Sequence, residues 1–162
     1  MSTFDVAFER ILRAEGPMSD RKNDHGGLTK FGISQRWNPK IDVANLTVAD
    51  ARAFYADKWT RWGLEQLPPR IALKIFDFAV NADMPDAARA AQRALCYLGA
   101  PVAVDGKLGP VTRAAIRAYR NPDALLAAIC GFQHAHYADV VEKDPDQVAF
   151  AGGWAIRAAW RP

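Results

Sequence analysis

The sequence is poor in the residue types on which disulfide-linked and metal-binding proteins depend. It holds two cysteines and three histidines among 162 residues. Cys96 and Cys130 lie in apolar helical stretches, and we expect two buried free thiols there. The histidines lack a third ligand at a spacing typical of zinc. The sequence therefore predicts no metal and no other cofactor.

Long hydrophobic runs and blocks of one charge are also absent. The apolar runs are short and broken by charges, so we expect no stable membrane insertion. The N-terminal stretch carries Asp5, Glu9 and Arg10 within its apolar pattern, unlike a secretory signal peptide. The formal net charge is only +3 and is spread evenly along the chain. This weak, dispersed charge argues against a nucleic-acid partner.

Helix-forming residues are abundant. Thirty alanines against three serines favour helices, and Phe4, Phe8 and Ile11 recur with helical spacing. Glycines and polar residues over 16–40 predict a long loop with a short hairpin around 29–33. We therefore predict a mainly all-α, monomeric protein with one small β-hairpin. The expected helices span about residues 4–15, 48–60, 71–82, 85–99, 110–119, 122–143 and 146–160.

Three polar residues near the N-terminus are candidates for acid–base chemistry. Glu15 ends the first predicted helix, where the helix dipole disfavours an ionised carboxylate and raises its pKa, as a general acid requires. Asp24 follows in the polar loop, and glycoside hydrolysis needs such a second carboxylate. Thr29 carries a hydroxyl that could hold a water. The alternatives are a solvated Glu, an Asp that caps a turn and an ordinary strand Thr.

Several short motifs together resemble a known family. Glu-Gly at 15–16 and Asn-Asp-His-Gly-Gly-Leu-Thr-Lys-Phe-Gly-Ile-Ser at 23–34 are similar to the signature of the glycoside hydrolase family 108 muramidases. Later stretches resemble the family's predicted peptidoglycan-binding part and the segment at the junction with that part. They are residues 76–82, 91–95, 104–112 and 153–157. Each motif is short, but the ordered set spans about residues 4–160.

The resemblance implies a lysozyme-like helical fold that cleaves the glycan of peptidoglycan. It implies a catalytic segment over 1–66 and a peptidoglycan-binding segment over 67–162, packed as one compact domain. Glu15 would protonate the bond between N-acetylmuramic acid and N-acetylglucosamine, while Asp24 and Thr29 place a water or steady the transition state. Pro17 and His25 depart from the family pattern, and the Asp-to-Thr spacing is one residue shorter than in phage-type lysozymes.

Four further residues are candidates for contacts with the substrate. Tyr55 and Trp59, with Trp37 in the preceding segment, would form a sugar-stacking platform or pack in the core. Asn81 would bind an acetamido group or cap a helix. Asp77 lies in an apolar run, so it is either a hub of structural hydrogen bonds or a residue of the binding site.

Other functions remain open at this point. A lytic transglycosylase would cleave the same bond without an attacking water, and a non-catalytic cell-wall-binding or secretion-associated module would need no Glu15. With no export signal in view, we expect a phage or prophage endolysin. It would accumulate in the cytoplasm and reach the wall through a membrane lesion. The aromatic and basic stretch 154–161 would touch an anionic envelope surface or complete the core.

Overall fold

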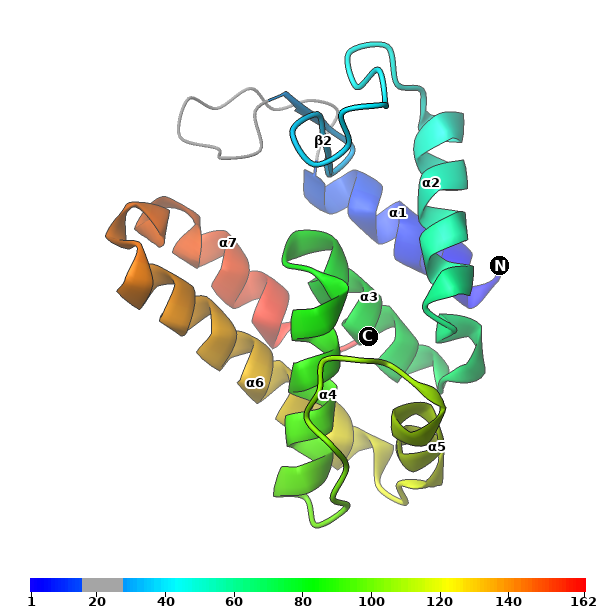
Figure 1. The fold of residues 1–162 in the computed structure, drawn as a ribbon, viewed down its shortest axis with the longest axis vertical. Coiled ribbons are helices and arrows are strands. Elements are labelled where there is room, and N and C mark those ends of the chain that lie inside the picture. The colour runs from blue at the N-terminus through cyan, green and yellow to red at the C-terminus, as the bar shows by residue number, and fades with distance from the viewer. Residues whose placement is uncertain (16–27) are drawn as a thin grey trace. The chain divides into compact units, whose positions relative to one another are not determined.

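The computed structural model describes residues 1–15 and 28–162 of the chain (Figure 1). Over these residues the chain forms seven α-helices, two 3₁₀ helices and one pair of antiparallel strands. The prediction of a mainly all-α protein with one small hairpin is confirmed. The elements are α1 (Thr3–Glu15), β1 (Thr29–Lys30), β2 (Ile33–Ser34), α2 (Val48–Arg61), η1 (Leu64–Gln66), α3 (Pro69–Asn81), α4 (Met84–Tyr97), α5 (Pro110–Ala118), α6 (Pro122–Lys143), η2 (Pro145–Gln147) and α7 (Val148–Ala159).

The chain divides into two compact units. The first runs from Met1 to Trp62 and the second from Gly63 to Pro162. This division rests on the density of contacts within each unit. The predicted segments 1–66 and 67–162 concern function, so that prediction remains untested.

Capping side chains set the beginnings of both helices in the first unit. Ser2 and Asp5 exchange hydrogen bonds between side chain and backbone at the start of α1. Thr47 and Asp50 form the same capping box before α2. Such caps satisfy backbone N–H groups that have no partner inside the helix. Arg52 then joins the two helices through an ion pair with Asp5, at 2.6 Å between Nη2 and Oδ1.

The hairpin of the first unit turns through two residues with left-handed backbone conformations. Thr29 pairs with Ser34 and Lys30 with Ile33. Phe31 has φ of +53° and Gly32 has φ of +76°. Positive φ at both central residues is the pattern of a type I′ turn, whose twist matches that of the flanking strands. Glycine adopts this conformation freely, whereas Phe31 does so at a cost of about 1–3 kcal/mol.

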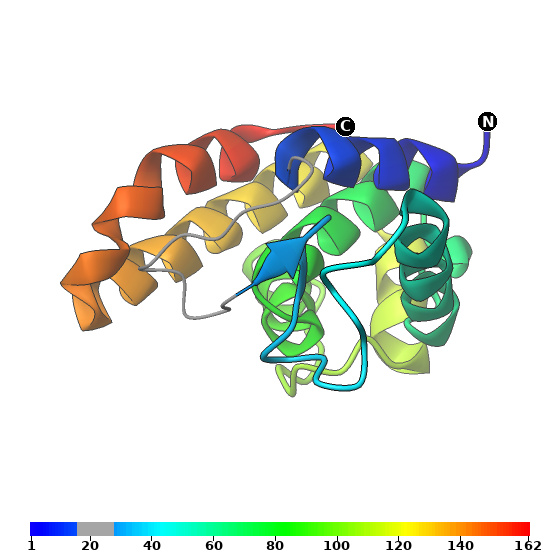
Figure 2. The same ribbon diagram turned by 90° about the horizontal axis from the view of Figure 1, so that it is seen from above.

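The second unit is built around α3. Every residue of α3 from Ile71 to Ala79 is buried, the polar Lys74 and Asp77 included, so this helix lies at the centre of the unit. Helices α4, α6 and α7 pack on it, and α7 runs back along α6 (Figure 1, Figure 2). Each fully buried large side chain of this core contributes about 1.5–3 kcal/mol. The largest apolar ones are Phe76, Phe78, Leu64, Ile71, Ile75, Leu95, Ile116, Leu125 and Leu126.

A buried lysine joins α3 to the end of α7. Lys74 is fully buried, and its Nζ donates to the carbonyl oxygens of Arg157, Ala158 and Trp160 at 2.9–3.0 Å. The last carbonyls of a helix have no partner within it and carry partial negative charge. The ammonium group therefore adds three hydrogen bonds to carbonyl oxygens at the C-terminal end of α7.

The two cysteines and the apolarity of the helices can be compared with the sequence-based expectations. Cys96 and Cys130 are both free; Cys130 is buried and Cys96 is half-buried. No helix within residues 1–15 and 28–162 is long and apolar enough to cross a membrane.

Candidate functional site

Helix α1 carries the candidate acid as its last residue. Ala7, Phe8 and Ile11 form its buried face, and the helix ends at Glu15 as the sequence predicted. The side chain of Glu15 and the whole of Asp24 lie outside the described residues. The helix end supplies partial negative charge at the backbone position of Glu15. The roles of the two carboxylates stay predictions.

Thr29 begins β1 and is half-buried. Its strand is held to α2, because the phenol of Tyr55 donates a hydrogen bond to the carbonyl oxygen of Phe31 at 2.9 Å. This hydrogen bond holds the hairpin turn at Phe31, whose left-handed backbone conformation is unfavourable for a phenylalanine. The core of the first unit therefore holds one side of the hairpin, and this hairpin carries Thr29.

The aromatic candidates separate into buried and exposed rings. Tyr55 is 2% exposed and Trp59 is 5% exposed. Trp59 packs edge-on against Phe4, with ring centroids 5.7 Å apart, and Tyr55 lies 6.3 Å from the ring of Phe8. These contacts are those of core residues, the alternative that the sequence left open. Trp37, in contrast, is 72% exposed.

Asp77 and Asn81 lie one helical turn apart on α3, in the second unit. Asp77 is buried, at 4% exposed, and the guanidinium of Arg157 donates to its backbone carbonyl at 3.3 Å. The Oδ1 atom of Asn81 is buried and has no hydrogen-bond partner among residues 1–15 and 28–162. A buried acceptor in this state can still receive an N–H donor from a ligand. Substrate binding by Asp77 and Asn81 remains a prediction.

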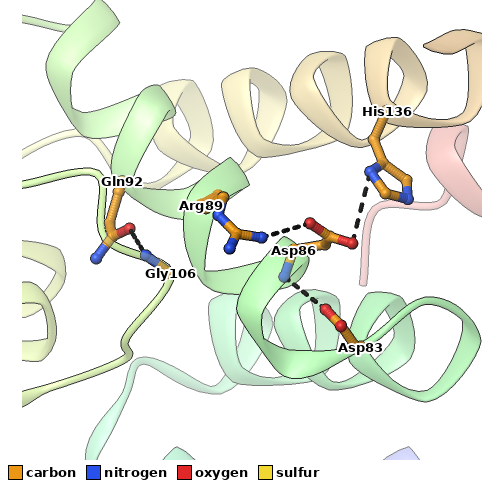
Figure 3. Close-up of polar contacts among 6 residues, drawn as sticks. All are labelled: Asp83, Asp86, Arg89, Gln92, Gly106 and His136. Carbon is orange, nitrogen blue, oxygen red and sulfur yellow. Dashed lines mark hydrogen bonds and ion pairs between the residues drawn. The ribbon is translucent and has the colours of Figure 1, made fainter.

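A buried glutamine, whose role the sequence did not reveal, organises the loop before α5. Gln92 is fully buried in α4. Its Nε2 donates to Asp105, to the carbonyl of Lys107 and to Thr112 at 2.7–3.2 Å, and its Oε1 accepts from the amide of Gly106 at 3.0 Å (Figure 3). One side chain thus fixes the whole turn. The signal in the sequence was a lone glutamine within an alanine-rich helix, which periodicity alone does not mark.

The same turn has a carboxylate and a glycine in specialised roles. Hydrogen bonds from the backbone of Lys107 and from Gln92 lower the pKa of Asp105, because they favour the charged form. Gly106 has φ of +74°, and a Cβ there would lie 3.2 Å from the carbonyl oxygen of Pro85. Both the positive φ and the close approach require glycine.

A polar cluster covers the beginning of α4. Asp83 accepts from the amide of Asp86 at 2.7 Å and caps the helix. Asp86 then accepts from Arg89 at 2.7 Å and lies 3.9 Å from Nδ1 of His136 on α6 (Figure 3). These contacts join α4 to α6 within the second unit. In the part of the chain that the structure describes, no three His, Cys, Asp or Glu side chains gather to hold a metal ion.

Comparisons with known proteins match most of the chain. The family model "Glycosyl hydrolase 108" matches residues 8–82, and "Predicted Peptidoglycan domain" matches residues 86–159. A solved structure described as SagA of Brucella abortus is similar, with a TM-score of 0.80 and 25% identity. That match covers 97% of this chain and 90% of the other. No curated protein matches the chain. The family resemblance expected from the motifs is confirmed.

Proposed function

Because residues 8–82 belong to the glycosyl hydrolase 108 family and residues 86–159 to the predicted peptidoglycan domain family, we propose that this chain is an N-acetylmuramidase. The two matches support the coarser description of a hydrolase that acts on peptidoglycan. The proposal adds the bond, which joins C1 of N-acetylmuramic acid to O4 of N-acetylglucosamine. The observation that carries it is the pairing of a glycosidase segment with a peptidoglycan domain in one chain.

Glu15 is the general acid in this proposal. It is the last residue of α1 and lies within the matched glycosidase segment. Partial negative charge at the end of the helix disfavours its ionised form. A neutral carboxylic acid can donate its proton to the glycosidic oxygen while the C1–O bond breaks.

Asp24 and Thr29 act on the opposite side of the reacting carbon. The carboxylate of Asp24 steadies the positive charge that develops on the sugar or takes a proton from the attacking water. The hydroxyl of Thr29, on β1, holds that water. A carboxylate separation of about 5 Å would give retention of configuration and about 6.5–9.5 Å would give inversion.

In this proposal the segment 86–159 binds the wall while the glycosidase segment 8–82 cleaves it. The segment 86–159 spans α5, α6 and α7 together with most of α4. The turn fixed by Gln92 and Gly106 lies inside this match. Binding by this segment raises the local concentration of glycan around the glycosidase segment.

Product analysis tests the proposal. Purified peptidoglycan is digested with the wild-type chain, and the fragments are examined by mass spectrometry. Reducing N-acetylmuramic acid ends are expected. Anhydro-muramic ends would identify a lytic transglycosylase, and the absence of any glycan cleavage would leave a wall-binding module.

The cellular role that we attach to this chemistry is that of a phage-type endolysin. Its place of action is the cell wall, reached from the host cytoplasm after the membrane has been permeabilised. Expression in a bacterial cytoplasm should then leave cells intact until a pore-forming agent is added. Lysis without that agent would contradict this role and leave the chemistry untouched.

A further inference from the structure

Helix α4 carries an aromatic ring and a cation on one exposed face. Tyr97, the last residue of α4, is 76% exposed. Arg93, one helical turn earlier, is also exposed. Residues four apart on a helix are neighbours on its surface. The phenol ring and the guanidinium therefore lie side by side, within the segment that matches the predicted peptidoglycan domain.

The ring of Tyr97 is held by a second ring on α6. Its centroid lies 6.2 Å from that of Phe132, with an angle of 78° between the two planes. Phe132 is half-buried, so it supports Tyr97 from the protein side. An edge-to-face pair of this kind is favourable, and the exposed fraction of Tyr97 shows that most of its ring stays open to a ligand.

The backbone beneath Tyr97 is fixed by the end of the helix. Gly99 has φ of +81°, and the amide of Ala100 donates to the carbonyl of Leu95 at 2.9 Å. This is the Schellman arrangement, which ends a helix in one defined conformation. A ring that is already oriented loses little conformational entropy when a ligand stacks on it.

The charge beside the ring is positive. Between Asp86 and Asp105 the chain holds Arg89 and Arg93 and no acidic residue. Asp86 engages Arg89 at 2.7 Å, whereas the guanidinium of Arg93 has no hydrogen bond or ion pair with residues 1–15 and 28–162. A free guanidinium can bind a carboxylate bidentately. This face is therefore complementary to a ligand that presents an apolar ring face and a carboxylate.

We propose that Tyr97 and Arg93 form a recognition surface for glycan strands that carry their stem peptides. This inference rests on the wall-binding part of the proposed function and names the contacts that make it. Tyr97 stacks on the C–H face of a pyranose ring, and Arg93 pairs with a carboxylate of the stem peptide. In an intact wall the lactyl carboxyl of N-acetylmuramic acid is amide-linked to the peptide, so the free carboxylates belong to the stem.

The ring contact is tested by measuring the Kd of labelled, soluble peptidoglycan fragments. The full chain carries Glu15→Gln, so that binding is read without cleavage. Adding Tyr97→Ala should raise Kd about tenfold, the scale of losing an aromatic anchor at an interface, whereas Tyr97→Phe keeps the ring and should keep Kd. Val6→Ala is the control, because Val6 is 39% exposed and lies outside both matched segments.

The guanidinium contact is tested with Arg93→Gln on fragments with intact stem peptides and on strands freed of their peptides. Kd for the peptide-bearing fragments should rise about three- to fivefold, the scale of an exposed ion pair, and Kd for the bare strands should stay nearly unchanged. Lys40→Gln removes the same charge from an exposed residue outside the predicted peptidoglycan domain and should change neither. Thermal unfolding should be the same for all variants, because these side chains are exposed.

The outcomes separate this inference from the proposed cleavage. If Tyr97→Ala binds as tightly as Val6→Ala, the recognition surface is wrong, and product analysis still decides the muramidase proposal. Equal weakening of both kinds of strand by Arg93→Gln, or equal effects of Arg93→Gln and Lys40→Gln, would overturn the pairing with the stem peptide. If the wild type cleaves no glycan but Tyr97→Ala weakens binding, the cleavage proposal fails and the recognition surface stands.

Discussion

The hydroxyl of Tyr55 on α2 donates a hydrogen bond to the carbonyl oxygen of Phe31 in the hairpin turn, at 2.9 Å. Phe31 has a left-handed backbone conformation, with φ of +53°, which a phenylalanine adopts only when its surroundings compensate the strain. The hydrogen bond is part of that compensation. It links the buried core of the first unit to the strand that carries Thr29.

Tyr55→Phe should loosen the hairpin while the core ring remains. The loss of one part-buried hydrogen bond should lower the free energy of unfolding by about 1 kcal/mol. Amide hydrogen exchange of Lys30 and Ile33 should become faster. Tyr119→Phe is the control, because the hydroxyl of Tyr119 only reaches the carbonyl of Leu98 at 3.5 Å. Unchanged exchange in Tyr55→Phe would show that the turn is held by other contacts.

The first unit should lose stability in acid, because the ionised Asp5 carboxylate stabilises it at neutral pH. Hydrogen bonds from the Ser2 backbone and from Arg52 lower the pKa of Asp5 to about 2 from 3.8. A depressed carboxyl pKa contributes stability above the unfolded-state pKa and loses it as the pH falls through the folded-state value. Asp5→Asn should therefore be less stable than the wild type at pH 7, and this difference should shrink below about pH 4 and be mostly lost by about pH 2. Urea unfolding at several pH values measures it; a difference at pH 2 as large as that at pH 7 would refute the assignment.

Lys74→Met should destabilise the second unit. The substitution keeps an unbranched side chain but removes the donor for three carbonyl oxygens at the end of α7. The loss of these three hydrogen bonds should lower the free energy of unfolding by about 1–3 kcal/mol. Lys143→Met, at the exposed end of α6, should change it by less than about 0.5 kcal/mol. Equal stability of the two variants in urea would contradict the role of Lys74.

Gly106→Ala should disturb the turn inside the predicted peptidoglycan domain more than Gly99→Ala does. Both glycines have positive φ, +74° and +81°, so both substitutions strain the backbone. Only at Gly106 would the new Cβ also meet a backbone oxygen at 3.2 Å. We expect weaker co-sedimentation with purified cell walls for Gly106→Ala and wild-type co-sedimentation for Gly99→Ala. Equal binding by both variants would show that this turn does not contribute to wall binding.

The helix boundaries could be predicted because they depend on capping residues that are close in the sequence. Thr47 with Asp50, and Asn121 before Pro122, are caps that act within one turn. The hairpin followed in the same way from the glycine-containing stretch around residue 29. Each of these features depends on neighbours close in the sequence, so the pattern alone sufficed.

Long-range partners could not be predicted. Lys74 interrupts an apolar run, and its acceptors come from residues more than eighty positions away. Gln92 organises a loop, but a single glutamine gives no periodic signal. The sequence also offered Trp37 and Trp59 as members of one aromatic group. Burial separates them, because it depends on packing against α1 rather than on residue type.

The central claim is that Glu15 is the proton donor in glycan cleavage, and the most direct test compares Glu15→Gln with Glu9→Gln. Both lie on α1, and Glu9 is exposed and paired with Arg13. Loss of a general acid should lower kcat by about 10²–10⁴-fold, so reducing N-acetylmuramic acid ends should disappear from Glu15→Gln digests and persist in Glu9→Gln digests. Equal release of these ends by both variants would contradict the account.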